Sequence, residues 1–412
     1  MHELRCKDAK FSVSTPSHAK ILVTPHRVVS TECTKYDSIQ PMEIALTHDA
    51  EGWDAFIAAQ PWRPFLQSWT MGEVYGDIGQ KPIRMTVTES GKILCVCFGS
   101  IVKARRGTYI SVPYGPLIDE SISQAEVTRI TTALILKLKT EAKKQGCSFI
   151  RFSPFWPQGR HQEAYKTLGS IQSPLHMLAE HVWYLPLEDS SGKRRTEDEL
   201  QADMRKTTRN LIRRAEKDGV TIEKSPDPVE DLPEFIALHD ETRKRHGFTA
   251  YTHAFFQSQV RRFSERKECS VYLAKFQGKT IAASIHMHAF GETSYHHGAS
   301  SSEYQKIPAS YLLQWTAIRD AMKRGDRIYN FWGIAPMSDQ RIAESGEQHA
   351  KNESFRYPLP TTRSHPFAGV TLFKTGFGGH VLNLVHCKDE PVTQAYWLTY
   401  AFERYRKWKR GF

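Results

Sequence analysis

The sequence predicts an α+β protein made of two similar units, each with a mixed, mostly antiparallel sheet flanked by helices. Its 412 residues, at roughly 150 per domain, suggest two or three domains. A composition of 40% apolar and 25% charged residues is typical of ordinary globular proteins. The order of strands and helices also appears twice along the chain, which indicates an internal repeat.

The first copy begins with a hairpin that turns at Ser90-Gly91. The elements expected in this half are strands at Pro82–Glu89, Lys92–Lys103 and Tyr109–Val112, a long helix from about Ser123 to Lys144, and a strand at Ser148–Ser153. The helix ends at a glycine, which favours helix termination, and an apolar strand follows. This order is what the second half repeats.

The second copy has the same order, with a first turn at Gln277-Gly278. Its expected elements are strands at Val271–Phe276, Thr280–Ala289 and Thr293–Gly298, a helix from about Ala309 to Lys323, and a strand at Arg327–Trp332. The segments 144–152 and 323–331 align as matching helix-glycine-strand junctions. Hairpins beside a long helix with a further strand beyond it describe the splayed sheet of the GNAT acyltransferase fold, an analogy that identifies fold better than chemistry.

Positive charge is concentrated in two segments of a chain whose net charge is +11. Six cations face one anion between Met204 and Lys217, and five face one between Glu403 and Arg410. The first segment lies in a helix expected from about Thr196 to Asp218, whose buried stripe we expect to be Leu200, Met204, Leu211, Ile212 and Ala215. Such charge can hold a polyanion, or it can be a solvated helix face.

Several classes of protein are disfavoured by the sequence. The seven cysteines show neither zinc spacing nor a disulfide framework, and no apolar run reaches the roughly 20 residues of a membrane span. The start of the chain lacks the apolar core of a signal peptide, so we expect a cytoplasmic protein. A nucleophile elbow and a P-loop are missing, as is the glycine loop that binds the coenzyme A pyrophosphate. His286, His288, His296 and His297 could form a metal site on neighbouring strands, although structural histidines with backbone partners fit better.

A chain of short motifs in one order resembles the FemABX peptidyltransferases. The matching motifs are Phe65-Leu-Gln-Ser-Trp69 with Gly72-Glu-Val74, Tyr114-Gly-Pro116 with Asp119, Arg205-Lys-Thr-Thr-Arg209, Ile212–Val220, Thr242–Gly247, Pro308–Trp315, Tyr329–Ile334 and Phe373-Lys374. They span most of the chain. The resemblance implies tandem GNAT-like domains and transfer of an amino acid from aminoacyl-tRNA to the stem-peptide amine of a peptidoglycan precursor, which builds cell-wall cross-bridges or side branches.

The resemblance also shapes the expected domain organisation. Residues 1–40 are read as a loosely ordered extension, 41–187 as the first domain and 188–390 as the second, with a mobile loop at 337–366. The C-terminal helix within 391–412 is expected to return and pack on the first domain. We expect a monomer, and we expect neither cofactor nor metal, because aminoacyl-tRNA is already an activated donor.

The resemblance assigns roles to individual residues. It implies that Lys374 stabilises the tetrahedral intermediate and that Phe373 lines the site near the tRNA end. Asp119 contacts the acceptor amine or, alternatively, caps a helix or closes a turn. The other expected substrate-binding residues are Tyr75, Tyr114, Arg205, Arg209, Arg213, Arg214, Arg245 and Tyr251, with the arginines contacting phosphates of tRNA or of the precursor.

Two departures from the family pattern affect whether a UDP-linked or a lipid-linked acceptor is expected. Tyr75 and Tyr251 stand where relatives place basic side chains that bind the diphosphate of a UDP-linked precursor. A lipid-linked acceptor, reached at the inner membrane face through the basic C-terminal helix, is therefore an alternative to a UDP-linked one.

Two other functions remain open at this stage. One is an acyl-CoA-dependent N-acyltransferase of tandem GNAT type that acts on a sugar or peptide amine in envelope polysaccharide assembly. The other is a non-catalytic RNA-binding protein that uses the basic helix, although few aromatic residues have the pattern of base-stacking platforms.

Overall fold

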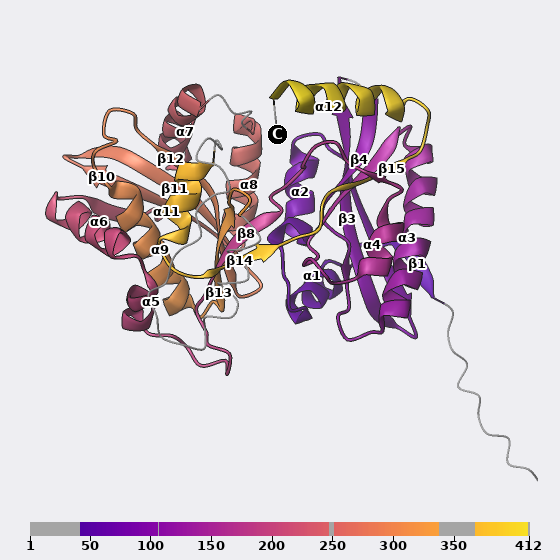
Figure 1. Ribbon diagram of the computed structural model, residues 1–412, viewed down its shortest axis with the longest axis horizontal. Coiled ribbons are helices and arrows are strands. Elements are labelled where there is room, and N and C mark those ends of the chain that lie inside the picture. Colours follow the sequence, from indigo (N-terminus) through magenta and orange to yellow (C-terminus); the bar gives the residue numbers. More distant parts are fainter. Residues whose placement is uncertain (1–41, 106, 247–250, 338–366, 411–412) are drawn as a thin grey trace, which may run out of the picture. The chain divides into compact units, whose positions relative to one another are not determined.

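The computed structural model describes residues 42–105, 107–246, 251–337 and 367–410, and the described strands form two mixed sheets flanked by helices (Figure 1). The elements up to residue 172 are β1 (Glu43–Leu46), α1 (Ala50–Ala59), η1 (Phe65–Gln67), α2 (Trp69–Asp77), β2 (Pro82–Glu89), β3 (Lys92–Ala104), β4 (Gly107–Tyr114), β5 (Leu117–Ile118), α3 (Gln124–Lys144), β6 (Phe149–Pro154), α4 (Gln162–Leu168) and β7 (Ile171–Gln172).

The remaining elements are β8 (His181–Pro186), α5 (Glu197–Asp203), α6 (Lys206–Lys217), β9 (Thr221–Lys224), α7 (Leu232–His246), α8 (His253–Glu265), β10 (Cys269–Phe276), β11 (Lys279–Ala289), β12 (Glu292–Ser300), α9 (Ala309–Arg324), β13 (Ile328–Gly333), α11 (Ala368–Thr375), β14 (His380–Asn383), β15 (Lys388–Pro391) and α12 (Tyr396–Arg410).

The duplicated α+β unit is confirmed by the pairing of the strands. In the first sheet β2, β3 and β4 form an antiparallel meander, α3 follows, and β6 returns parallel to β4. In the second sheet β10, β11 and β12 form the same meander, α9 follows, and β13 returns parallel to β12. Both sheets are therefore mixed and mostly antiparallel, as the sequence predicts.

A capping box begins the long helix α3, and a glycine follows each of the two long helices α3 and α9. Ser123 caps α3, and its hydroxyl and the Glu126 carboxylate form a reciprocal capping box. The helix ends before Gly146 and α9 ends at Gly325, both with positive φ, a conformation that costs glycine least. The helix-glycine-strand junctions expected from the sequence are therefore real chain reversals.

The sheets exchange strands across the expected domain boundary. β8, which the division at residue 187 assigned to the first domain, pairs with β13 and β14 in the second sheet. β15, which was assigned to the second domain, pairs with β6 in the first sheet. The predicted boundary is wrong for these two strands, because pairing at a sheet edge depends on distant partners that a local pattern does not reveal.

The basic segment forms two helices, so the single helix expected from 196 to 218 is wrong. The chain is extended at Arg205, between α5 and α6, and the amide of Arg205 donates to the carbonyl of Gly376. The Arg209 guanidinium donates to the carbonyls of Gln201 and Met204 at the end of α5. Of the expected stripe, Leu200, Met204, Ile212 and Ala215 are buried, whereas Leu211 is half-buried.

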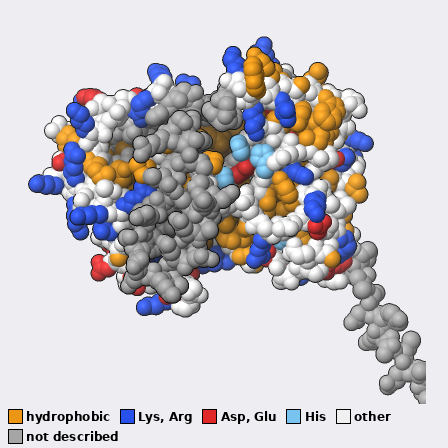
Figure 2. Space-filling model, in the orientation of Figure 1, with side chains coloured by type: hydrophobic (Ala, Val, Ile, Leu, Met, Phe, Trp, Pro, Cys, Tyr) orange, Lys and Arg blue, Asp and Glu red, His pale blue; other side chains and the backbone are white. Residues whose placement is uncertain are grey.

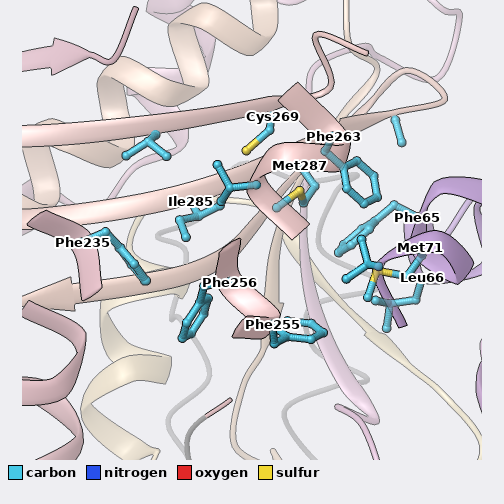
Figure 3. Packing of buried hydrophobic residues seen from close by; sticks show 14 of the residues in the cluster. Phe65, Leu66, Met71, Phe235, Phe255, Phe256, Phe263, Cys269, Ile285 and Met287 are labelled. Carbon is cyan, nitrogen blue, oxygen red and sulfur yellow. The ribbon is translucent and has the colours of Figure 1, made fainter. Parts of the chain in front are cut away.

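A shared hydrophobic core joins the two halves. Phe65 and Met71 of the first half pack among side chains of the second, including Phe263, whose ring lies edge-on 5.8 Å from that of Phe65 (Figure 3). Beside this core, Asp77 accepts hydrogen bonds from Ser258 and from Arg262. These contacts fix one half against the other.

The C-terminal helix packs on the first sheet, as the sequence resemblance implies. Arg151 of β6 lies between the carboxylates of Asp389 in β15 and Glu403 in α12, at 2.7 Å from each. Residues 1–40 and nearly all of 337–366 lie outside the described residues. Among the helices that the structure describes, none is long and apolar enough to cross a membrane.

Candidate active site

The second sheet opens where β12 and β13 part. Their parallel pairing covers only Glu292–Ser294 against Ile328–Asn330, although both strands continue. A cavity of about 540 Å³ occupies this region, between the strands, α9 and α11. In the first sheet β4 and β6 stay paired from Tyr109 to Tyr114, so the corresponding gap is closed there.

Lys374 lies in the cavity wall, in the last turn of α11. Its side chain is buried, and Nζ donates a 2.7 Å hydrogen bond to the carbonyl oxygen of Gly333. Nζ also lies 5.7 Å from the centroid of the Tyr295 ring. Burial lowers the pKa of Lys374 to about 7. None of the described residues that line the cavity is a carboxylate, so this amine faces no local counter-charge there.

Phe373 also lines the cavity, as expected from its position beside the lysine. Its ring packs edge-on against Tyr311 of α9, with centroids 4.9 Å apart. The contact fixes α11 against α9 and gives the cavity an aromatic wall.

The basic helix meets the lysine-bearing helix at Arg205. The Arg205 guanidinium donates to the Leu372 carbonyl at 3.1 Å and to the Thr375 hydroxyl at 2.7 Å. The basic segment and the Phe373-Lys374 motif, which are far apart in the sequence, are therefore in neighbouring helices that contact each other. Arg205 holds α11 in place and lies beside the cavity wall.

The remaining arginines occupy different surroundings. Arg209 is engaged with backbone carbonyls at the end of α5, Arg213 is exposed, and Arg214 is exposed with Asp218 at 3.3 Å. Arg245 lines the cavity and donates to the hydroxyl of Ser302 at 2.7 Å. Of the six expected cations, Lys374 and Arg245 thus line the cavity itself.

Tyr75 and Tyr251, which stand where relatives have basic side chains, both contact the ring of Phe255. The rings of Tyr75 and Tyr251 lie 6.1 and 4.3 Å from that of Phe255. Tyr114 is buried and donates its hydroxyl proton to the carbonyl of Ala179. The structure therefore brings Tyr75 and Tyr251 together, and it places Tyr114 in the shared core.

Asp119 is not among the described residues that line the cavity. Its carboxylate accepts from Lys92 at 2.6 Å and from the amide and hydroxyl of Ser121. Burial raises the pKa of this carboxyl, but these hydrogen bonds outweigh burial and lower it. The turn-closing role that the sequence allowed is present, and the contact with an acceptor amine stays a prediction.

His296 is a cavity residue whose role the sequence analysis did not identify. Its side chain is half-buried, but both ring nitrogens are buried and neither has a hydrogen-bond partner among the described residues. Burial lowers the pKa of His296 to about 3, so the ring is neutral. The alternation of His286, His288 and His296 along two strands was the available signal, but it does not reveal which ring faces a cavity.

The other three strand histidines have side-chain partners. His286 bonds the Tyr329 hydroxyl, His288 bonds Ser270, and His297 bonds Gln259. The backbone partners expected for them are therefore replaced by side chains. Within the described residues, the one group with metal-ligand geometry is elsewhere, at His176, Glu180 and His386.

Comparisons with known proteins agree with this architecture. Residues 48–174 match the FemAB family, and residues 202–341 match the acetyltransferase (GNAT) domain. The crystal structure of FemX superposes with a TM-score of 0.68 at 17% identity, covering 87% of this chain and 99% of that chain. At this identity the likeness concerns the fold.

Two further structures are less similar. The C-terminal domain of a putative lysylphosphatidylglycerol synthetase from Agrobacterium fabrum gives a TM-score of 0.49 at 16% identity, covering 86% of this chain and 95% of that one. A tandem GNAT protein from the clavulanic acid biosynthesis pathway gives 0.48 at 11% identity, covering 85% and 99%. No curated protein matches the chain.

The fold and the cavity define a tandem GNAT-like transferase. Its second sheet opens between β12 and β13, and the cavity lies in this opening. The two family matches indicate an enzyme that transfers acyl groups. The FemAB family match lies in the first half of the chain and the GNAT match in the second, and the likeness to FemX shows the same fold.

Proposed function

We propose that the protein moves an amino acid from aminoacyl-tRNA to the stem-peptide amine of a peptidoglycan precursor. The observation that carries this proposal is Lys374, a buried amine in the cavity wall that has no carboxylate beside it among the described lining residues. The FemAB family match suggests the reaction class, and the basic helix beside α11 offers a surface suited to tRNA phosphates.

The reaction needs alignment and charge stabilisation more than an enzyme nucleophile. The acceptor amine attacks the ester carbonyl, a C–N bond forms, and the C–O bond to the ribose breaks. The ribose oxygen leaves with the proton that the amine gives up. In its protonated form Lys374 has three N–H donors, of which Gly333 engages one, so others can stabilise the oxyanion.

His296 supports the same use of the cavity. The two buried nitrogens of this ring have no partner among the described residues, which is costly unless a ligand completes their hydrogen bonds. A polar group of the aminoacyl ester or of the acceptor amide would do so, since the neutral ring offers one donor and one acceptor.

The match of residues 202–341 to an acetyltransferase domain favours a second candidate, an acyl-CoA-dependent N-acyltransferase. Calorimetry with coenzyme A separates the two candidates. Micromolar binding would favour the second, and its absence together with binding of charged tRNA would favour the first.

The direct test incubates the protein with a mixed pool of charged tRNAs and either UDP-linked or lipid-linked precursor, and then measures product masses. We expect a mass increase by one or more aminoacyl residues, which deacylated tRNA does not support. If neither acceptor gains mass, the proposed reaction is wrong.

A further inference from the structure

The outer face of α12 carries an exposed apolar stripe. Leu398, Phe402, Tyr405 and Trp408 recur at spacings of four and three, so they lie on one side of the helix. Their exposed fractions are 77%, 39%, 54% and 79%. An amphipathic helix of a globular protein normally turns its apolar stripe toward the core. Here the stripe points away from it.

The opposite face of α12 is fixed to the first sheet. Tyr396 is fully buried and donates its hydroxyl proton to Asp389 at 3.1 Å. Glu403 is 7% exposed and pairs with Arg151. Since Tyr396, Thr399 and Glu403 form the buried side, the rotation of the helix is set, and the apolar stripe cannot turn inward without breaking these contacts.

Cations flank the stripe on both sides. Helical spacing puts Arg404 on one side of the stripe and Arg406 on the other, where its guanidinium carbon lies 6.0 Å from the Phe402 ring centroid. The exposed Lys409 lies within the stripe, and Lys407 lies on the opposite side of the helix. Arg404 and Lys407 also line a hollow of about 590 Å³ together with His176 and His386. Figure 2 shows hydrophobic and cationic side chains side by side over α12.

We infer that α12 docks the protein onto an anionic lipid bilayer. The stripe would lie in the interfacial region with the helix parallel to the membrane, and the flanking cations would contact lipid phosphates. Tryptophan, phenylalanine and leucine on one face with lysine and arginine beside it is the pattern of interfacial helices. Each cation near an anionic surface adds roughly 1 kcal/mol of attraction, equivalent to about fivefold in affinity.

The charges favour a membrane over a second copy of the chain. A symmetric pair of α12 helices would bring the cations Arg404, Arg406 and Lys409 of both copies close together, and like charges oppose such a contact. A bilayer with anionic headgroups complements both the apolar stripe and the cations. This inference uses only the exposed face of α12, so it does not depend on the proposed reaction.

Flotation of the full-length protein with vesicles tests the inference. Phosphatidylcholine vesicles containing about 30% phosphatidylglycerol are compared with pure phosphatidylcholine vesicles, at low and high salt. The test variant carries Leu398→Gln, Phe402→Gln and Trp408→Gln. The matched control carries Leu46→Gln, Leu136→Gln and Val229→Gln, three apolar positions outside α12 that are 52%, 62% and 44% exposed.

We expect the unmodified chain and the control to float with anionic vesicles, less with neutral vesicles, and less at high salt. The α12 variant should bind at least about tenfold more weakly, because it loses three interfacial side chains. Thermal unfolding checks that both variants are folded. The inference is overturned if the unmodified chain does not float, or if both variants lose binding equally. If sedimentation shows a concentration-dependent dimer that the α12 variant no longer forms, α12 is a dimer interface, and the membrane inference is overturned.

Discussion

The amino group of Lys374 and the carbonyl oxygen of Gly333 are joined by a 2.7 Å hydrogen bond. This bond links α11 to the end of β13, at the place where β13 no longer pairs with β12. A flexible lysine side chain is thereby held in the opening of the second sheet. The geometry gives the lysine a fixed position from which its remaining N–H groups can reach a ligand.

Replacing this lysine should separate binding from chemistry. Lys374→Met keeps most of the side chain but removes the donors, and we expect the transfer rate to fall about 10²- to 10³-fold. Affinity for charged tRNA should change by less than about threefold, because the cations proposed to contact tRNA phosphates are other residues. Lys323→Met removes the same charge from an exposed position of α9 and should leave the rate unchanged. Equal rates for Lys374→Met and the unmodified chain would exclude the proposed role.

The same lysine should make stability depend on pH. Burial lowers its pKa from 10.5 to about 7 in the folded protein, so the unfolded chain holds more protons between these values. Folding is therefore opposed most strongly below pH 7, and the cost disappears above about pH 10. Lys374→Met should raise the melting temperature more at pH 6 than at pH 10. A difference independent of pH would contradict the burial of a charged amine.

Two arginines of the basic segment should behave differently. Arg209→Ala removes the donor to two carbonyls at the end of α5, and we expect a loss of about 1–3 kcal/mol in the free energy of unfolding. Arg213→Ala, at an exposed position, should leave stability within about 0.5 kcal/mol. It should instead weaken tRNA binding, and the slope of log affinity against log salt concentration should become about one unit less steep. Urea unfolding measures the first effect, and filter binding at several salt concentrations measures the second. If the salt dependence of tRNA affinity does not change, Arg213 is not part of the proposed tRNA-binding surface.

The unpaired histidine of the cavity should matter for substrate rather than for folding. His296→Phe removes two buried unsatisfied nitrogens, so stability should be unchanged or higher, while transfer should fall about tenfold. His297→Phe is the contrast, since it breaks a 3.2 Å hydrogen bond to Gln259 and should lower stability. Thermal unfolding and steady-state transfer kinetics measure the two effects. Full activity of His296→Phe would show that no substrate group bonds this ring.

The buried ion pairs beneath α12 should be important for stability. Arg151→Met leaves the carboxylates of Asp389 and Glu403 buried without their cation, and we expect a loss of about 3–5 kcal/mol. Arg129→Met breaks an exposed pair with Glu89 and should cost less than about 1 kcal/mol. Urea unfolding of both variants tests the difference, and similar losses would contradict the burial of the Arg151 cluster.

Much of the fold is readable from local sequence. Apolar alternation predicts β2 and β3, and the capping residue Ser123 and the glycines after the long helices set their limits. Motif order also pointed to Phe373-Lys374, and the structure places both side chains in one cavity. These features depend on short-range geometry or on residues that are adjacent in the chain.

The sequence by itself determined the repeated order of elements, the limits of the two long helices α3 and α9, and the residue pair in the cavity wall. Only the tertiary structure decided that β8 and β15 exchange sheets and that the second sheet opens while the first stays closed. It alone shows that His296 lines the opening with no hydrogen-bond partner among the described residues. It also decided that the apolar side of α12 faces outward. The physical reason is that strand pairing, burial and desolvation depend on partners hundreds of residues away, whereas a periodic pattern reports only that a face is apolar.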